Sequence, residues 1–243
     1  MKRIAIIPAR YGSTRLPGKP LLDETGKPLI RHVVEQVRQA DRLDDIVVAT
    51  DDERIVSAVE GFGGKAVMTS TECRTGTDRL AEAARKLDLT ADDVVVNVQG
   101  DEPDIPPSCI DRLINLLETD TAPMATLATR LLPNSAADPN RVKVVFDRNG
   151  LALYFSRAKI PHDRDATGEV DYYLHLGIYA YRVGFLEEFA AMENTPAESA
   201  EKLEQLRALE NGYRIAVAPV SYDGNGIDTR EDYAAFVERF GTE

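Results

Sequence analysis

The sequence predicts an α/β protein with a mostly parallel β-sheet and helices on both faces. Two observations lead to this prediction. Apolar runs of strand length alternate with segments of helical period through roughly the first 120 residues. These runs are continuous rather than alternating with polar residues, as expected of strands buried on both faces. Ligands of such sheets bind at the carboxyl ends of the strands, so the loops there are expected to hold the chemistry.

In the first half of the chain, strands and helices are expected to alternate. The β-branched run at 94–98 is the strongest strand signal, and the segment from Thr75 to Leu87 has an apolar face of helical spacing. Asp52 is expected to start a helix that continues through Val59. The expected elements in order are a strand at 4–7, a helix at 29–37, a strand at 46–50, a helix at 52–59, a strand at 66–68, a helix at 75–87, a strand at 94–98 and a helix at 110–117.

The pattern changes after residue 120, where strands follow one another without long helices between them. Antiparallel pairing is therefore expected, as a small β insertion. We predict a single domain over 1–243, with a β-rich subregion around 124–182 for dimerisation and sugar binding. The expected elements are strands at 124–130, 142–146, 151–155 and 172–181, helices at 185–192 and 200–211, a strand at 215–219 and a closing helix that Thr229 caps and that ends at Phe240.

Composition and charge exclude several classes of protein. The net charge of -12 argues against general binding to nucleic acids or anionic membranes. The apolar run after Arg3 ends at Pro8, too short for a signal peptide, and nowhere is there an apolar run of the ~20 residues that a membrane span needs. We expect a cytoplasmic protein. Cys73 and Cys109 have no metal or redox spacing, so buried thiols are expected.

The charge is unevenly distributed along the chain. Residues 1–31 carry seven cations and two anions, a net charge of +5. Because the whole chain has a net charge of -12, the remaining residues carry -17. An acidic protein with a basic opening segment suggests a local binding site for an anion.

The loop after the first strand suits a polyphosphate. Residues 8–20 read Pro-Ala-Arg-Tyr-Gly-Ser-Thr-Arg-Leu-Pro-Gly-Lys-Pro and contain three cations and two glycines. Glycines allow backbone N–H groups to approach phosphate oxygens, while Arg and Lys supply persistent positive charge. The loop is not a Walker A motif, because five residues separate Gly12 from Gly18 and Pro20 stands where a Ser or Thr would bind magnesium.

Two distant aspartates are candidates for a magnesium site. Asp101 follows the strand that ends near Gln99, and Asp228 is expected to follow the last strand. If both strand ends open on one edge of the sheet, the two carboxylates meet there, and Mg²⁺ binds one or two carboxylates together with substrate phosphates. An aspartate after a strand is more often only a turn residue. Glu102 and Asp104 are alternative ligands.

The phosphate loop resembles the signature loop of the 3-deoxy-manno-octulosonate (Kdo) cytidylyltransferases, the CMP-Kdo synthetases. Further stretches that match this family cover nearly the whole chain in order: Val48-Ala49-Thr50-Asp51, Gly76-Thr77-Asp78-Arg79-Leu80, Asn97-Val98-Gln99-Gly100-Asp101-Glu102-Pro103, Ala152-Leu153-Tyr154-Phe155-Ser156-Arg157, His175-Leu176-Gly177-Ile178-Tyr179, Leu203-Glu204-Gln205-Leu206-Arg207 and Ile227-Asp228-Thr229. The resemblance implies the fold of nucleotide-diphospho-sugar transferases, a homodimer, and an enzyme that makes CMP-Kdo and pyrophosphate from CTP and Kdo for lipopolysaccharide biosynthesis.

The resemblance also implies roles for individual residues, with Mg²⁺ as cofactor on Asp101 and Asp228. The implied catalytic residues are Arg10, Lys19, Asp101 and Asp228. The implied CTP-binding residues are Ala9, Arg10, Gly12, Ser13, Arg15, Lys19 and Gly76. The implied sugar-binding residues are Arg79, Gln99, Arg157, His175, Tyr179, Glu204 and Gln205.

Taken without the resemblance, the residues on the sugar side allow two interpretations each. A lone histidine such as His175 among apolar residues is more often part of a core than a ligand-binding group. Arg79 and Arg157 suit bidentate binding of a carboxylate, but structural pairing is equally compatible with the sequence. Glu204 and Gln205 are expected in the middle of a helix, where a solvated face is the simpler interpretation.

The predicted reaction is displacement at the α-phosphorus of CTP by the anomeric hydroxyl of the sugar acid. Arg10, Arg15 and Lys19 are expected to hold the triphosphate, and magnesium is expected to lower the pKa of the hydroxyl. Alternatives are activation of an amino-substituted Kdo or of sialic acid, a metal-dependent glycosyltransferase of related fold, and a catalytically silent nucleotide-binding regulator. Base specificity follows from the resemblance alone.

Overall fold

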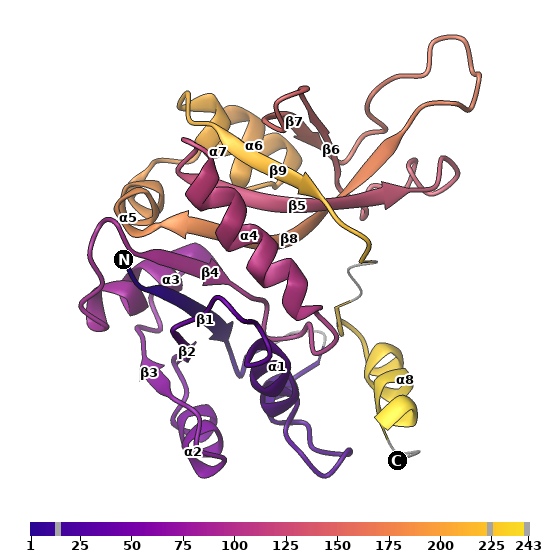
Figure 1. Cartoon of the computed structure of the whole chain (residues 1–243). Coiled ribbons are helices and arrows are strands. Elements are labelled where there is room, and N and C mark those ends of the chain that lie inside the picture. Colours follow the sequence, from indigo (N-terminus) through magenta and orange to yellow (C-terminus); the bar gives the residue numbers. More distant parts are fainter. Residues whose placement is uncertain (13–15, 223–225, 241–243) are drawn as a thin grey trace.

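A computed structural model describes residues 1–12, 16–222 and 226–240 (Figure 1). Its strands are β1 Arg3–Ala9, β2 Asp45–Thr50, β3 Ala66–Met68, β4 Val94–Asn97, β5 Met124–Leu131, β6 Lys143–Phe146, β7 Ala152–Ser156, β8 Tyr172–Arg182 and β9 Ile215–Pro219. Among the described residues, nine strands form one sheet, whose main path is β3-β2-β1-β4-β8-β5-β9.

The sheet is mixed but mostly parallel, as the sequence predicts. β1 is parallel to β2 and β4, β2 to β3, and β5 to β9. The antiparallel portion is β8, which pairs with β4 on one side and β5 on the other, together with the β6–β7 hairpin beside it. The long β8 strand therefore lies inside the sheet rather than in a separate insertion.

Helices cover both faces of the sheet, as predicted. The helices are α1 Leu29–Val37, α2 Glu53–Gly61, α3 Gly76–Lys86, α4 Pro107–Thr119, α5 Val183–Ala191, α6 Pro196–Glu201, α7 Gln205–Glu210 and α8 Arg230–Phe240, with a short 3₁₀ turn, η1, at Lys19–Leu21. Buried side chains of α1, α2 and α4 pack on one face, and those of α3, α5 and α7 pack on the other.

The first strand shows why its apolar run is continuous. Ala5 and Ile7 of β1 pack toward α1, α2 and α4, whereas Ile4 and Ile6 pack toward α3 and α5. All four are at most 5% exposed. Burial of this apolar surface on both faces stabilises the sheet by about 25 cal/mol per Å² removed from water, and it leaves the strand ends as the places where polar groups can gather.

Side-chain caps fix the starts of three helices. Asp52 caps α2 by accepting a hydrogen bond from the Arg54 N–H, as predicted. Thr75 and Asp78 form a reciprocal capping box at the start of α3. Thr229 accepts a hydrogen bond from the Asp232 N–H at the start of α8, and the Asp232 carboxylate accepts one from the Thr229 N–H. Such caps contribute about 1 kcal/mol each.

The predicted helix at 200–211 is wrong as a single helix. The chain forms α6 and α7 instead, because Lys202 adopts a left-handed conformation with φ of 54° and ends α6. The buried guanidinium of Arg207 in α7 then pairs with Glu198 in α6, at 2.7 Å between Nη2 and Oε1. Glu204 consequently lies at the start of α7 rather than in the middle of a helix.

The C-terminal helix α8 packs against the region that follows β1. Tyr233 and Phe236 of α8 form a small apolar cluster with Leu16, Leu29 and Ile227. Figure 1 shows α8 beside α1, away from the helices that cover the far half of the sheet. This packing holds the segment before α8 close to the carboxyl end of β1.

Two further predictions concern the cysteines and the membrane. Cys73 and Cys109 are both buried and free, as expected from their spacing. Over the described residues, none of the helices combines the length and apolar character that crossing a bilayer requires.

Candidate active site

A cavity of about 270 Å³ lies at the carboxyl ends of β1 and β4. It contains every predicted CTP-binding residue that the structure describes; Ser13 and Arg15 fall outside the described residues. The lining residues are Pro8, Ala9, Arg10, Gly12, Lys19, Pro20, Gly76, Gln99, Gly100 and Asp101. We call this space the basic cavity, because Arg10 and Lys19 are its cationic residues. Another cavity of about 660 Å³, near Arg130 and Tyr173, lies on the outer part of the sheet, away from these strand ends.

Two glycines shape the walls of the basic cavity. A Cβ on Gly100 would lie 2.9 Å from the carbonyl oxygen of Pro8, so glycine lets the loop after β4 approach the end of β1. Gly18 has a φ of +69°, and its N–H donates to the Tyr11 carbonyl at 3.0 Å. That hydrogen bond closes the loop and precedes η1, which carries Lys19.

Arg10 connects the phosphate loop to the start of α3. One of its Nη atoms donates to the carbonyl oxygens of Cys73 and Thr75, at 2.5 and 3.2 Å. The guanidinium is thereby held beside Gly76, at the N-terminus of α3, where backbone N–H groups and the helix dipole favour an anion. A phosphate group in the cavity would meet both sources of positive potential.

Lys19 joins two carboxylates from distant parts of the sequence. Its Nζ lies 2.6 Å from Oδ2 of Asp101 and 3.7 Å from Oδ1 of Asp228, and it donates to the Ile227 carbonyl at 2.8 Å. The Ile227 N–H in turn donates to the Asp101 carbonyl at 2.9 Å. The structure thus brings together the cation and the aspartates that the sequence singled out; we call these three side chains the Lys19 cluster.

Asp228 reaches the cluster by a different route from the one predicted. Asp228 follows the last strand, as predicted, but not at its end, because β9 ends at Pro219 and is separated from β4 in the sheet by β8 and β5. The connection after β9 brings Asp228 back to the end of β4, just before α8. Packing of α8 against Leu16 and Leu29, rather than the end of a strand, places this carboxylate.

The Lys19 cluster has the chemistry of a magnesium site. Its two carboxylates offer hard oxygen ligands, and both lie around one cationic point. In the described ranges, no group of three or more His, Cys, Asp or Glu side chains is arranged to hold a metal ion. A divalent cation here would therefore need phosphate oxygens and water as further ligands, which is the usual mode for Mg²⁺. The metal-binding role remains a prediction.

A further cavity lies on the other side of the Lys19 cluster. Its volume is also about 660 Å³, but it is distinct from the cavity near Arg130. We call it the acidic cavity because four carboxylates line it. Its lining residues are Glu102, Asp138, Asn140, Arg141, Val142, Leu174, His175, Leu176, Gly177, Gly226, Asp228 and Asp232. Gln99 links the two cavities, since it lines the basic cavity while its Nε2 donates to the Gly177 carbonyl at 3.1 Å.

His175 lies in the wall of the acidic cavity, where the sequence predicted a sugar contact. Its ring is flanked by Phe155 and Tyr179, with ring centroids 5.0 and 5.3 Å away, and Nε2 is 3.1 Å from the Thr126 hydroxyl. Burial lowers the pKa of His175 to about 3. The imidazole is therefore neutral at physiological pH, and it can hydrogen-bond to a ligand but cannot supply positive charge.

The two arginines predicted to bind a carboxylate of the sugar form contacts with other protein groups. Arg79 is fully buried, and its Nη2 lies 2.6 Å from Asp51 Oδ2. Arg157 donates from Nε to the Glu201 carbonyl at 2.7 Å and from Nη1 to the Pro139 carbonyl at 3.0 Å. Neither side chain lines the acidic cavity. Both side chains therefore have structural partners, and their sugar-binding role remains an expectation drawn from resemblance.

The predicted sugar residues Tyr179, Glu204 and Gln205 contact other protein groups or are buried. Tyr179 contacts the ring of His175, and Glu204 accepts a hydrogen bond from the Thr77 hydroxyl at 2.7 Å. Gln205 is 5% exposed. None of the three is among the residues that line either cavity. Their sugar-binding role has no support from the geometry and remains an expectation drawn from resemblance.

Sequence reasoning missed most of the acidic cavity. Asp138, Asn140 and Arg141 lie in the connection before β6, which contains no recognisable motif. Of the two alternative metal ligands, Glu102 lines the cavity, whereas Asp104 pairs with Arg239 of α8 at 2.6 Å. Burial, with a further contribution from the charge of Asp101, raises the pKa of Glu102 to about 7.

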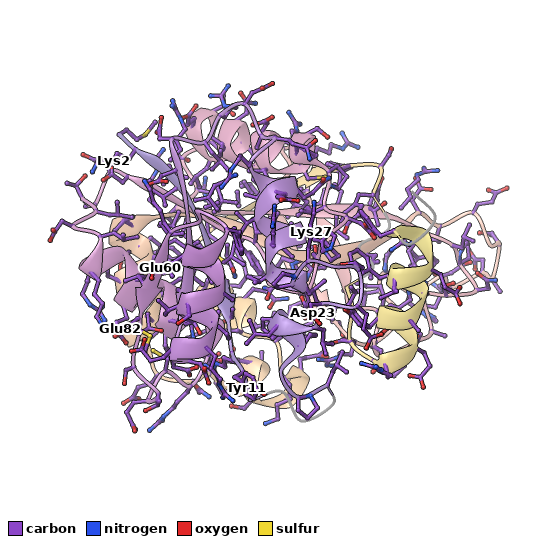
Figure 2. The ribbon with its side chains drawn as sticks, turned by 90° about the horizontal axis from the view of Figure 1, so that it is seen from below. Lys2, Tyr11, Asp23, Lys27, Glu60 and Glu82 are labelled. Atoms are coloured by element: carbon purple, nitrogen blue, oxygen red, sulfur yellow. The ribbon has the colours of Figure 1, made fainter. Side chains whose placement is uncertain are left out.

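The basic opening segment does not gather at one place. Arg3 pairs with Glu118, and Lys27 and Arg31 both pair with Glu35. Figure 2 shows Lys2, before β1, and Tyr11, just after it, on different sides of the view. Of the seven cations, Arg10 and Lys19 line the basic cavity, and Arg15 lies outside the described residues. The anion site rests on these loop residues rather than on the regional charge excess.

A basic cavity at a helix N-terminus, a carboxylate pair and a second polar cavity beside it suit a nucleotidyltransferase. Comparison with known proteins specifies the family. Residues 4–215 match the sequence model of the cytidylyltransferase family. The chain belongs to this family and, within it, to the 3-deoxy-manno-octulosonate cytidylyltransferases.

Several known proteins are similar over nearly the full length. The 3-deoxy-manno-octulosonate cytidylyltransferase of Desulfatibacillum aliphaticivorans is 54% identical over 96% of both chains. The 8-amino-3,8-dideoxy-manno-octulosonate cytidylyltransferase of Shewanella sp. strain ANA-3 is 50% identical over 98% of both chains. A solved structure of CMP:2-keto-3-deoxy-manno-octonic acid synthetase complexed with CTP superposes with a TM-score of 0.94 at 42% identity, covering 100% of this chain and 99% of that one.

Proposed function

We propose that this enzyme transfers CMP from CTP to the anomeric hydroxyl of Kdo, releasing pyrophosphate and forming CMP-Kdo. The names of the relatives support this substrate pair. The observation that carries the proposal is the position of Lys19, which lines the basic cavity and contacts Asp228 in the wall of the acidic cavity. Two substrates bound in the two cavities would meet at this cluster.

The basic cavity suits the triphosphate. Arg10 and Lys19 would neutralise the phosphate charge, and the N-terminus of α3 at Gly76 would add N–H donors. As pyrophosphate leaves, the same cations would stabilise the charge that develops on it. Holding both reactants in this geometry replaces a bimolecular encounter with a local one.

The carboxylates define the point of reaction. Asp101 and Asp228 are the residues that would hold Mg²⁺, and the ion, when bound, would lower the pKa of the attacking hydroxyl and reduce its repulsion from the phosphate. Lys19 holds both carboxylates close together through its ion pairs. The neutral His175 is then left as a hydrogen-bonding group for the sugar rather than as a base.

A pyrophosphate-release assay tests this proposal. CTP, UTP, ATP and GTP are offered in turn with Kdo and Mg²⁺, and release is expected with CTP and Kdo together. Sialic acid in place of Kdo should give little release. Pyrophosphate formation without Kdo, or with UTP as readily as with CTP, would contradict the proposed reaction.

Activation of an 8-amino sugar is the second candidate. The 50% identity to relatives named for that substrate supports it. The acidic cavity supports it too, since the carboxylates of Asp138 and Asp232 line it and would attract an ammonium group. Competition between Kdo and its 8-amino analogue in one assay separates the two candidates. The higher kcat/KM identifies the substrate.

The setting of the reaction is also a proposal. The enzyme would act in the cytoplasm, where CTP is present, and supply activated sugar for lipopolysaccharide. A homodimer would cover the exposed Leu153 and Tyr154 of β7, which are 63% and 38% exposed. One chain has a mass of 26.8 kDa, and light scattering of the purified enzyme should give twice that mass. The mass of a single chain would contradict the proposed dimer surface.

A further inference from the structure

We infer that Arg141 binds the carboxylate of the sugar acid in the acidic cavity, an assignment that rests on the proposed function. Arg141 lies in the connection before β6 and lines this cavity together with His175 and Asp228. Its guanidinium has no hydrogen bond or ion pair with any side chain or carbonyl in the described part of the chain. It is half-buried, so a ligand in the cavity can reach it.

The charges in the acidic cavity single out Arg141. Glu102, Asp138, Asp228 and Asp232 all line the cavity, and Arg141 is the one Lys or Arg residue in its described lining. An anionic sugar would be repelled by this wall unless a cation neutralised its carboxylate. Because His175 stays neutral, it cannot serve as that cation.

The other arginines near the sugar side are committed to protein groups. Arg79 is paired with Asp51 beneath the surface, and Arg157 is held by two backbone carbonyls. Withdrawing either from its partners would leave buried polar groups unsatisfied, at a cost typical of broken buried hydrogen bonds. Arg141 can bind a carboxylate without losing an existing partner.

A buried lysine fixes the segment that carries Arg141. The Lys143 side chain is fully buried, and its Nζ donates to the Asp138 and Arg157 carbonyls at 2.8 and 2.7 Å. The Asn140 N–H donates to the Asp138 carboxylate at 2.8 Å, which closes the turn. Arg141 therefore extends from a fixed backbone, and this lowers the entropy cost of forming a bidentate contact.

The test compares the wild type with Arg141→Ala on two acceptors, Kdo and its C1 carboxamide, with pyrophosphate release as the readout. For Arg141→Ala, we expect KM for Kdo to rise about 10- to 150-fold, the range for a hydrogen bond to a charged group. KM for CTP should stay unchanged. The wild type should prefer the acid over the amide, and Arg141→Ala should lose most of that preference. Arg141→Lys should recover part of it.

Arg148→Ala is the matched control, because it removes an arginine from an exposed position outside the cavity. It should leave both acceptors unaffected. An unchanged KM for Kdo and an unchanged preference for the acid in Arg141→Ala would overturn the assignment to Arg141. A wild type that releases no pyrophosphate from CTP and Kdo would instead overturn the proposed function. The two failures are therefore distinguishable.

Discussion

Glu102 makes the stability of this protein depend on pH in a way that one substitution can isolate. The residue lies between Asp101 and Pro103 in the turn after β4 and lines the acidic cavity. Burial disfavours its carboxylate, and the charge of Asp101 adds to the effect, so its pKa rises from 4.5 to about 7. The folded state consequently retains a proton on Glu102 that the unfolded state has released.

The sign and size of the effect follow from this difference in pKa. The favourable contribution of the protonated group is fully present below the unfolded pKa and is lost as pH rises through the folded pKa of about 7. A rise of the pKa from 4.5 to about 7 corresponds to at most about 3 to 4 kcal/mol. Glu102→Gln keeps the shape and carries no charge, so it should avoid this loss.

Urea unfolding of the wild type and of Glu102→Gln tests the reasoning, in EDTA so that no divalent cation compensates the charge. Between about pH 5 and pH 8.5, the free energy of unfolding of the wild type should fall by about 2 to 3 kcal/mol relative to that of the variant. Changes common to both proteins cancel in this comparison. Parallel pH profiles would refute the assignment of a raised pKa to Glu102.

Three further substitutions test other parts of the account. Asp101→Asn should lower kcat by about 10³-fold or more while leaving the urea midpoint near that of the wild type; near-normal turnover would remove Asp101 from the reaction. Lys19→Ala should lower kcat/KM for CTP by about 10- to 100-fold, because it removes a charged phosphate contact; unchanged kinetics would assign the loop another role. Arg207→Met should cost about 3 to 5 kcal/mol of stability, since it leaves Glu198 buried without its partner, and adding Glu198→Leu should restore part of the loss; an unchanged urea midpoint would show that the pair contributes nothing.

The sequence was sufficient for the parallel strands and for the loop after β1, because both depend on local patterns, but not for the place of β8 inside the sheet. Continuous apolar strands dictated burial on both faces, and the density of Arg, Lys and Gly marked the loop after β1. The break between α6 and α7 could not be predicted, because residues 200–211 have acceptable helix propensity throughout. Lys202 ends the first helix in a left-handed conformation, and Arg207 of the second helix pairs with Glu198 of the first, a tertiary contact without a sequence signal.

The site was predictable where a strand end places a residue and unpredictable where long-range packing does. Asp101 follows β4, so its position could be inferred, but Asp228 reaches the cluster through the packing of α8. Arg79 was expected at the sugar from the resemblance, and its pairing with Asp51, 28 residues away in the sequence, had no sequence signal. Arg141 gave no signal, since a single arginine before a short strand is usually solvated.

The central claim is that CTP and the sugar acid occupy the two cavities on either side of the Lys19 cluster. A crystal structure with Mg²⁺, a non-hydrolysable CTP analogue and Kdo tests it most directly. The account predicts the triphosphate against Arg10 and Lys19, and the sugar in the cavity that contains Asp228 and Arg141, with its anomeric hydroxyl toward the α-phosphate. Kdo bound outside that cavity, or a triphosphate away from Lys19, would contradict it.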